Sequence, residues 1–283
     1  NACGRMQNGK EAVALLVERN FKSAYNNADM INHYNEQRKD LDKAMTEEAN
    51  KIVENLKENN DHKAIVIYNE EWHKGVIGIV ASRLTEIYFQ PAVVLTRTDD
   101  LATGSARSVA GFDIYSAIAS CRDILENFGG HTYAAGLSLK VEHIPEFKRR
   151  FEEYVQKNIL HEQTLPNIDI DAVIGFQDIT HKFFMDMKRF QPFGPDNKKP
   201  VFCSEHVYDY GTSKVVGREQ EHIKLELVDN KSSKIMNGIA FGQSSQARYI
   251  KTKQSFDIVY TLEDNTHKRG EIQLQIEDIR PSE

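Results

Sequence analysis

The segment FGGHTYAAG at residues 128–136 combines glycines with a histidine in a way that suits phosphate binding. Paired glycines allow the backbone to approach a ligand closely and to turn successive amides toward an anion. His131 can donate to a phosphoryl oxygen or carry a proton near neutral pH. We therefore predict an anion-binding segment at Gly129, Gly130 and His131. The same letters also fit a helix that ends at Gly129 before a strand, with His131 as a surface group.

The run GSARS at residues 104–108 is a second candidate. A guanidinium can pair bidentately with phosphate oxygens, and flanking hydroxyls add further hydrogen bonds. The candidate phosphate-binding residues of this run are Gly104, Ser105, Arg107 and Ser108. Small polar residues around one arginine also form many ordinary turns, and taken alone the run favours the turn.

Two further glycine-containing segments are weaker candidates. WHKGVIG at residues 72–78 follows a predicted strand and opens a predicted helix, where free amides and the helix dipole attract anions. Its spacing is not that of a P-loop, so we favour a structural role, with Trp72 packed in a core. Arg5, in the turn sequence NACGRM, could face a phosphate or solvent, and its surroundings do not decide between them.

The first half of the chain predicts helices followed by an α/β domain. A short helix is expected over residues 11–18. One long charged helix follows over residues 23–59, which lack proline and glycine and carry apolar residues at helical spacing. The elements then alternate as strand 64–68, helix 75–88, strand 92–96, strand or loop 103–108, helix 113–127, strand 137–141 and helix 144–158.

After residue 166 strands dominate, and only 180–190 reads as a helix. Strands are predicted at 168–173, 201–210, 223–228, 235–241, 256–262 and 271–279. Short strands with polar turns predict a small closed barrel of the OB type. Barrel aromatics could stack on bases, although core packing is their commoner fate; these are Phe241, Tyr249, Phe256 and Tyr260.

Composition limits the classes of protein that remain. The length of 283 residues favours two domains, and no apolar run approaches the ~20 residues of a membrane-spanning helix. Cys3, Cys121 and Cys203 are too few and too far apart for a disulfide framework, so we expect a cytoplasmic protein. The net charge of −6 argues against indiscriminate binding of nucleic acid, so phosphate binding must be local.

No metal-ligand motif is present. The ten histidines are scattered, without HExxH or an Asp-x-Asp and histidine set. Asp169 and Asp171 share one face of a predicted strand but have no histidine beside them. We expect this chain to hold no metal or cofactor itself.

The motifs and their order resemble one family. Along the chain stand NACGRM, WHKGVIGIVASR, GSARS, FGGHTYAAG, QPFGPDNKKPVF and a terminal IRP. Over nearly the whole chain this resembles the C-terminal portion of bacterial RecJ-type single-strand-specific 5′-to-3′ exonucleases of the DHH phosphoesterase superfamily. GGHxxAAG marks the DHH-associated domain in general, and the WHKGVIG segment and the PFGPDN turn narrow the resemblance to RecJ.

The resemblance implies a division of labour. Residues 1–60 would be the end of the DHH region and a connecting helix, 61–160 the DHH-associated substrate-binding domain, and 166–283 an OB-fold nucleic-acid-binding domain. An N-terminal DHH domain, absent from this sequence, would hold the divalent metal ions, Mn or Mg, so this chain alone is expected to be inactive. The implied partner is single-stranded DNA, and replication or repair proteins could bind through the OB fold.

The family pattern also assigns roles to residues. It implies that Arg5, Ser105, Arg107 and Ser108 lie at the phosphate of the 5′ end. Gly129, Gly130 and His131 would face the scissile phosphate, with His131 assisting.

Two alternatives remain open. A tRNA-related protein could carry a DHH-associated domain, since alanyl-tRNA synthetases and their editing relatives have a similar glycine–histidine signature. The WHKGVIG segment and the barrel argue against it. A non-catalytic module that binds single-stranded nucleic acid is the second alternative.

Overall fold

A computed structural model describes residues 1–57, 62–194, 196–265, 268 and 270–282. The chain divides into two compact units, Asn1–Pro166 and Asn167–Glu283, and each is described by itself. Among the described residues, no helix combines the length and the apolar character that crossing a bilayer requires. The three cysteines are free and buried.

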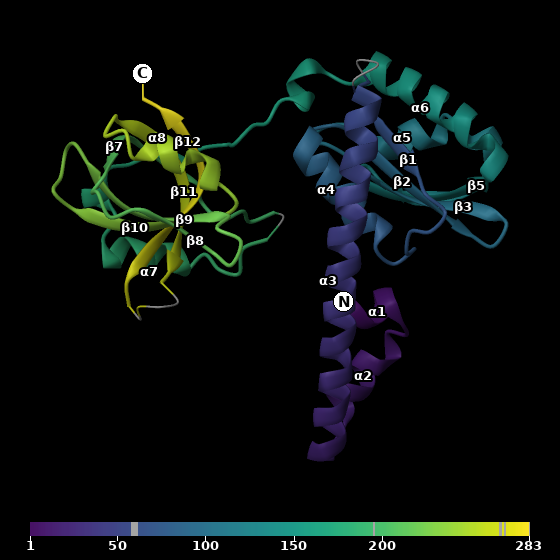
Figure 1. Cartoon of the computed structure of the whole chain (residues 1–283), viewed down its shortest axis with the longest axis horizontal. Helices are drawn as coiled ribbons and strands as arrows, with labels where there is room; N and C mark the ends of the chain where they lie inside the picture. The colour runs from purple at the N-terminus through teal and green to yellow at the C-terminus, as the bar shows by residue number, and fades with distance from the viewer. Residues whose placement is uncertain (58–61, 195, 266–267, 269, 283) are drawn as a thin grey trace. The chain divides into compact units, whose positions relative to one another are not determined.

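The first unit begins with three helices, α1 (Ala2–Met6), α2 (Lys10–Val17) and α3 (Phe21–Lys57). The predicted long helix is confirmed as α3 up to Lys57, and its predicted last residues, 58–59, lie outside the described residues. The helices α1 and α2 pack along α3 (Figure 1). Farther along, α3 covers one face of a sheet. Asp42 of α3 accepts two hydrogen bonds from the Arg83 guanidinium, at 2.9 and 2.8 Å, which ties α3 to α4 (Ile77–Tyr88).

A five-stranded sheet forms the body of this unit, in the order β1-β2-β3-β5-β4. Its strands are β1 (Ile65–Tyr68), β2 (Ala92–Thr98), β3 (Leu101–Arg107), β4 (Leu125–His131) and β5 (Ala134–Lys140). The β1–β2 pair is parallel and the other pairs are antiparallel. The helices α5 (Ile114–Ala119) and α6 (Ile144–Asn158) belong with the opposite face from α4 (Figure 1).

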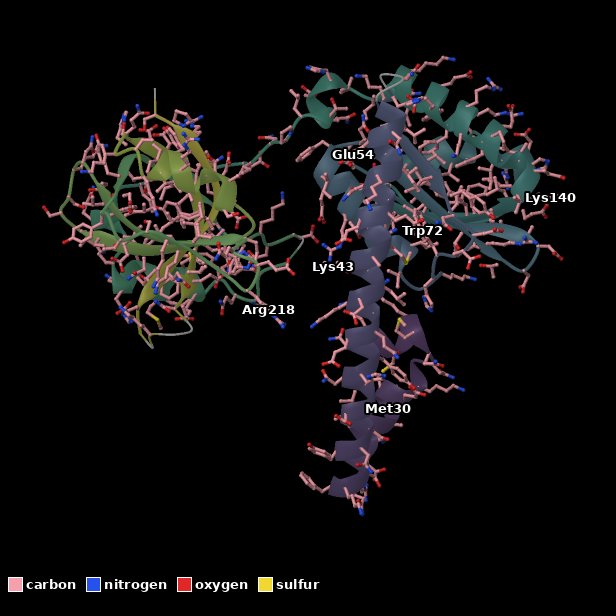
Figure 2. All side chains as sticks on the ribbon, in the orientation of Figure 1. Met30, Lys43, Glu54, Trp72, Lys140 and Arg218 are labelled. Carbon is pink, nitrogen blue, oxygen red and sulfur yellow. The ribbon has the colours of Figure 1, made fainter. Side chains whose placement is uncertain are left out.

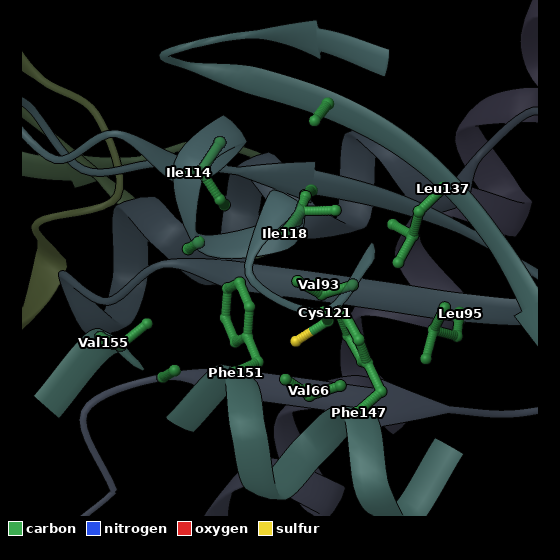
Figure 3. Close-up of a cluster of buried hydrophobic side chains, with 14 of the residues drawn as sticks. Val66, Val93, Leu95, Ile114, Ile118, Cys121, Leu137, Phe147, Phe151 and Val155 are labelled. Carbon is green, nitrogen blue, oxygen red and sulfur yellow. The ribbon is translucent and has the colours of Figure 1, made fainter. Parts of the chain in front are cut away.

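Each face of the sheet has its own apolar cluster. Phe147 and Phe151 of α6 pack with Val93, Leu137 and Cys121 on one side (Figure 3). On the other side, buried residues of α3 and α4 pack on β1 and β2. Trp72 (Figure 2) is buried in this second cluster, as predicted. Its indole N–H donates to the Glu48 carboxylate at 2.8 Å.

The predicted helix over residues 113–127 is wrong in its second half. Asp113 caps α5 with its carboxylate, but the helix ends at Ala119. A short 3-10 turn, Arg122–Ile124, follows, and β4 then begins at Leu125. Pairing with β5 overrides the helical spacing of the apolar residues in this stretch. Gly129 is therefore a strand residue, and its interpretation as a helix end is wrong as well.

The second unit is the predicted OB-type barrel. It contains α7 (His181–Lys188), α8 (Ala247–Ile250) and the strands β6 (Ala172–Val173), β7 (Phe202–Asp209), β8 (Lys214–Val216), β9 (His222–Asp229), β10 (Ile235–Ala240), β11 (Phe256–Asp264) and β12 (Ile272–Pro281). The sheet runs β7-β11-β12-β10-β9, and pairing of β9 with β7 closes it. Numbered along the chain, these five strands have the order 1-2-3-5-4 around the barrel.

Two details differ from the expectation. The predicted strand over 168–173 shrinks to β6, so Asp169 lies outside it. Asp171 instead accepts a hydrogen bond from the Val201 amide at 2.8 Å. The three-residue strand β8 was not predicted, because its few residues carry no readable alternation.

Candidate phosphate-binding site

The strands β3, β5 and β4 present a polar face on the side of the sheet where α4 lies. Side chains alternate along β3, so Ala102 and Ala106 are buried toward α6 while Thr103, Ser105 and Arg107 project to the other side. Register then defines three rows across β3, β5 and β4: Arg107–Ala134–His131, Ser105–Gly136–Gly129 and Thr103–Ser138–Asn127. We call these three rows the open face, because α4 packs on β2 and β3 and leaves Gly136, Gly129 and Asn127 exposed.

Two arginines meet beside the first turn of α4. The Arg107 guanidinium donates from Nη1 to Ser105 Oγ at 3.0 Å and to the Ala106 carbonyl at 2.7 Å. Arg5 donates from Nη1 to the carbonyl oxygen of Gly75, two residues before α4, at 3.0 Å. Residues about 100 positions apart in the sequence are thus brought to one helix end.

The positive charges of Arg5 and Arg107 beside the start of α4 are not balanced by a nearby carboxylate in the described chain. Burial lowers the pKa of Arg107 below its ordinary value, and the positive charge of Arg5 lowers it further. Among the residues that the structure describes, neither arginine forms a salt bridge with a carboxylate. No side chain caps the N-terminus of α4. Two neighbouring cations beside a helix N-terminus favour a bound anion, and the guanidinium groups suit phosphate oxygens.

Gly75 and Gly78 make this arrangement possible. A Cβ atom at Gly75 would overlap the carbonyl oxygen of Arg5, and one at Gly78 would lie 3.0 Å from Ser105 Oγ and 3.1 Å from Arg107 Nη2. The sequence of this segment favoured a structural role, and the two glycines do pack closely. They pack against the two arginines. In the sequence, the only sign of this close packing is the pair of glycines three residues apart at the start of a predicted helix.

His131 and Tyr133 lie at the end of the β4–β5 hairpin. His131 is exposed, and its Nδ1 accepts a hydrogen bond from the Tyr133 amide at 3.3 Å. The Tyr133 ring, 58% exposed, lies edge-on to the His131 ring with centroids 6.4 Å apart. An exposed aromatic beside a phosphate-binding segment can stack on a base, and Tyr133 was not among the residues predicted for this site.

The structure brings some predicted site residues together and separates others. Ser105 and Arg107 gather with Arg5, and Gly129 and His131 lie on the same face two strands away, about 10 Å across the sheet.

Gly104 and Ser108 do not join this group. Gly104 is buried on the α6 side, where a Cβ atom would lie 2.5 Å from Leu95, so its role is packing. The Ser108 hydroxyl is already engaged, since it donates to the Phe112 carbonyl at 2.6 Å.

Known protein families match both units. Residues 61–157 match the DHHA1 domain, and residues 170–278 match the RecJ OB domain. Over its full length the chain is 34% identical to the single-stranded-DNA-specific exonuclease RecJ of Bacillus subtilis. The chain thus carries a DHHA1 domain followed by a RecJ OB domain. The RecJ of Haemophilus influenzae is 27% identical over 99% of this chain.

The fold also matches a RecJ of known structure. The Thermus thermophilus RecJ solved with Mn²⁺ covers all of this chain, with a TM-score of 0.79 and 24% identity, and the likeness extends to 40% of that protein. The present chain spans 36% of the B. subtilis RecJ and 50% of the H. influenzae RecJ. It therefore represents about a third to a half of the length of these relatives.

Gly129 and Gly130 provide a matched pair of variants. Gly130 has φ +150°, and a Cβ atom there would lie 2.5 Å from Ala135 Cα, whereas Gly129 faces open space. We expect Gly130→Ala to lower the free energy of unfolding by about 1–3 kcal/mol and Gly129→Ala to leave it almost unchanged. Chemical denaturation of both variants measures this. Equal destabilisation of the two would contradict the assigned geometry.

Proposed function

We propose that this chain is the substrate-binding part of a single-stranded-DNA-specific 5′-to-3′ exonuclease. The observation that carries the proposal is the pair Arg5 and Arg107 at the start of α4, without a carboxylate partner in the described chain. A terminal phosphate supplies the negative charge that this pair lacks. The names of the RecJ relatives support the choice of single-stranded DNA.

We assign the 5′-terminal phosphate to Arg5, Ser105 and Arg107. The guanidinium groups would pair with its oxygens, and the Ser105 hydroxyl would add a hydrogen bond. His131 and the backbone of Gly129 would face the next phosphate along the strand, the one cleaved. The separation of about 10 Å between the β3 and β4 ends of the open face leaves room for one nucleotide between the two phosphates.

Hydrolysis itself is assigned to another part of a longer protein. T. thermophilus RecJ was crystallised with Mg²⁺ and with Mn²⁺, which supports a divalent metal in the family. The described residues of this chain contain no group of three or more His, Cys, Asp or Glu placed to hold such an ion. They do not fit a metal centre, so we assign them to binding and positioning the DNA.

An apolar surface on α2 and α3 supports the proposed domain boundaries. Leu16, Val17, Phe21 and Tyr25 lie around the turn between these helices and are each at least 66% exposed. Clustered exposed apolar side chains are typical of contact surfaces. We propose that residues 1–60 pack here against the DHH region, while residues 61–160 and 166–283 form the two binding domains.

The barrel offers a second contact with single-stranded DNA. OB folds bind nucleic acid on the face of their second and third strands, here β9 and β10. Phe241, directly after β10, is 55% exposed and lies edge-on to His222 of β9 with ring centroids 5.0 Å apart. Lys224 lies on the same face, opposite Lys214 of β8. Phe256 and Tyr260 are fully buried, so they pack in the core and cannot stack on bases.

Arg107→Ala tests the terminal phosphate site. We expect it to weaken binding of a 5′-phosphorylated single strand by about tenfold or more, since a charge-assisted hydrogen bond contributes roughly 1.5–3 kcal/mol. Binding of the 5′-hydroxyl strand should change much less. Fluorescence anisotropy with both oligonucleotides measures the difference. Lys157→Ala, an exposed position at the end of α6, is the control. An unchanged preference for the phosphorylated end in Arg107→Ala would refute the assignment.

A nuclease assay tests the division of labour. The chain should bind single-stranded DNA but leave it intact with Mn²⁺ or Mg²⁺, because the described residues form no metal centre. Gel analysis of 5′- and 3′-labelled strands, with binding checked on the same sample, provides the readout. Degradation from the 5′ end by the purified chain would show that the catalytic groups are present here after all.

Phe241→Ala tests the barrel contact. Loss of one stacking platform should weaken binding of a long single strand by about tenfold, since stacking contributes roughly 1–3 kcal/mol per base. Phe190→Ala, another exposed phenylalanine in the same unit, is the matched control. If both substitutions have equal effects, Phe241 has no special role. Replication or repair proteins that bind the barrel, and a cytoplasmic location, stay predictions.

A further inference from the structure

One row of the open face has no role in phosphate binding. Thr103 of β3, Ser138 of β5 and Asn127 of β4 lie side by side in register, and strand alternation places all three on the same side of the sheet as Ser105. Thr103 and Ser138 are partly exposed, and Asn127 is exposed. Within the described chain, these three side chains make no hydrogen bonds to other protein groups.

This row lies next to the phosphate site. It is two residues along the strands from the row Ser105–Gly136–Gly129, a distance of about 7 Å. The Arg107 guanidinium reaches Ser105, so the proposed phosphate position lies at that middle row. Gly136 and Gly129 have no side chains that could block a ligand extending from there toward Ser138. A group bonded to the phosphate would therefore reach the polar row directly.

The opposite direction offers fewer partners. The row on the other side of the phosphate position contains Ala134, whose side chain has no hydrogen-bonding group, between Arg107 and His131. Arg107 and His131 of this row are already assigned to the two phosphates, so neither is left for another part of the ligand. The open face thus provides free hydrogen-bonding side chains mainly on the side of Thr103, Ser138 and Asn127.

We propose that Thr103, Ser138 and Asn127 hydrogen-bond the base of the nucleotide whose 5′-phosphate is bound at Arg107. This inference rests on the proposed function and specifies how the terminal nucleotide is held. Hydroxyl groups can rotate to donate or accept, and an amide does both, so the row can satisfy the edge of any of the four bases. It would act as a grip on the base that does not depend on sequence.

The test compares normal and abasic ends in the wild type and three variants of the chain. Short 5′-phosphorylated strands carry A, C, G, T or an abasic residue as their 5′-terminal nucleotide. Their affinities are measured for the wild type, Asn127→Ala, Ser138→Ala and the double variant. The wild type should bind the four normal ends within about threefold of one another and the abasic end about tenfold more weakly, since each hydrogen bond contributes roughly 1 kcal/mol. In the double variant this difference should shrink to about threefold or less, since only Thr103 of the row remains.

Two further comparisons separate this inference from the proposed function. The double variant should keep the preference for a 5′-phosphate over a 5′-hydroxyl, because Arg5 and Arg107 are untouched. Gln156→Ala, on α6 at the other side of the sheet, should behave as the wild type. If the double variant discriminates against the abasic end as strongly as the wild type, or the wild type never does, the base grip is wrong even where the phosphate preference persists. If the wild type shows no phosphate preference, the proposed function fails, and the grip fails with it.

Discussion

The close approach of the first turn of α4 to Arg5 and to β3 is the contact on which the site depends. Arginines normally approach carboxylates, and two guanidinium groups beside a helix N-terminus repel one another and the helix dipole. They stay there because Gly75 and Gly78 let backbone and side chains pack where a Cβ atom would not fit, and because hydrogen bonds to Gly75 and Ser105 hold each group. The fold thus maintains an electrostatic imbalance that an anion can relieve.

The sheet keeps this polar site rigid by using its two faces differently. Along β3 and β5 every second residue is buried against α5 and α6, in the cluster that contains Phe147 and Phe151. The intervening residues from Thr103 to Arg107 and from Ala134 to Ser138 are small or polar and form the open face. Because side chains alternate with a period of two, a change of register by one residue would bury Arg107 and expose Leu137. The apolar core therefore fixes which residues meet the ligand.

Local patterns predicted much of this architecture, and contacts between distant segments decided the rest. The amphipathic spacing over 144–158 matches α6 residue for residue, and the barrel strands follow their alternation closely. The strand β4 was missed because Asp113 is a helix cap and the apolar residues after it keep a helical spacing as far as residue 127. Residues from Leu125 onward form a strand because they pair with β5. Gly104 looked like a ligand-binding residue, but the alternation of residues along β3 places it on the face of the sheet that packs in the core. The face of the sheet on which each strand residue lies cannot be assigned until the neighbouring strands and the packed helices are known.

Net charge is a poor guide to the proposed phosphate site for a related reason. The chain carries −6 overall, yet many of its charges cancel locally, as on α6, where Glu146 accepts hydrogen bonds from both Arg149 and Arg150. These arginines lower the pKa of Glu146 to about 2. Arg5 and Arg107 differ from them in having no carboxylate partner in the described chain, although both are ordinary arginines in the sequence. The proposed anion site is marked by two partly buried arginines that lie close together without such a partner, because an arginine already paired with a carboxylate gains little from a phosphate.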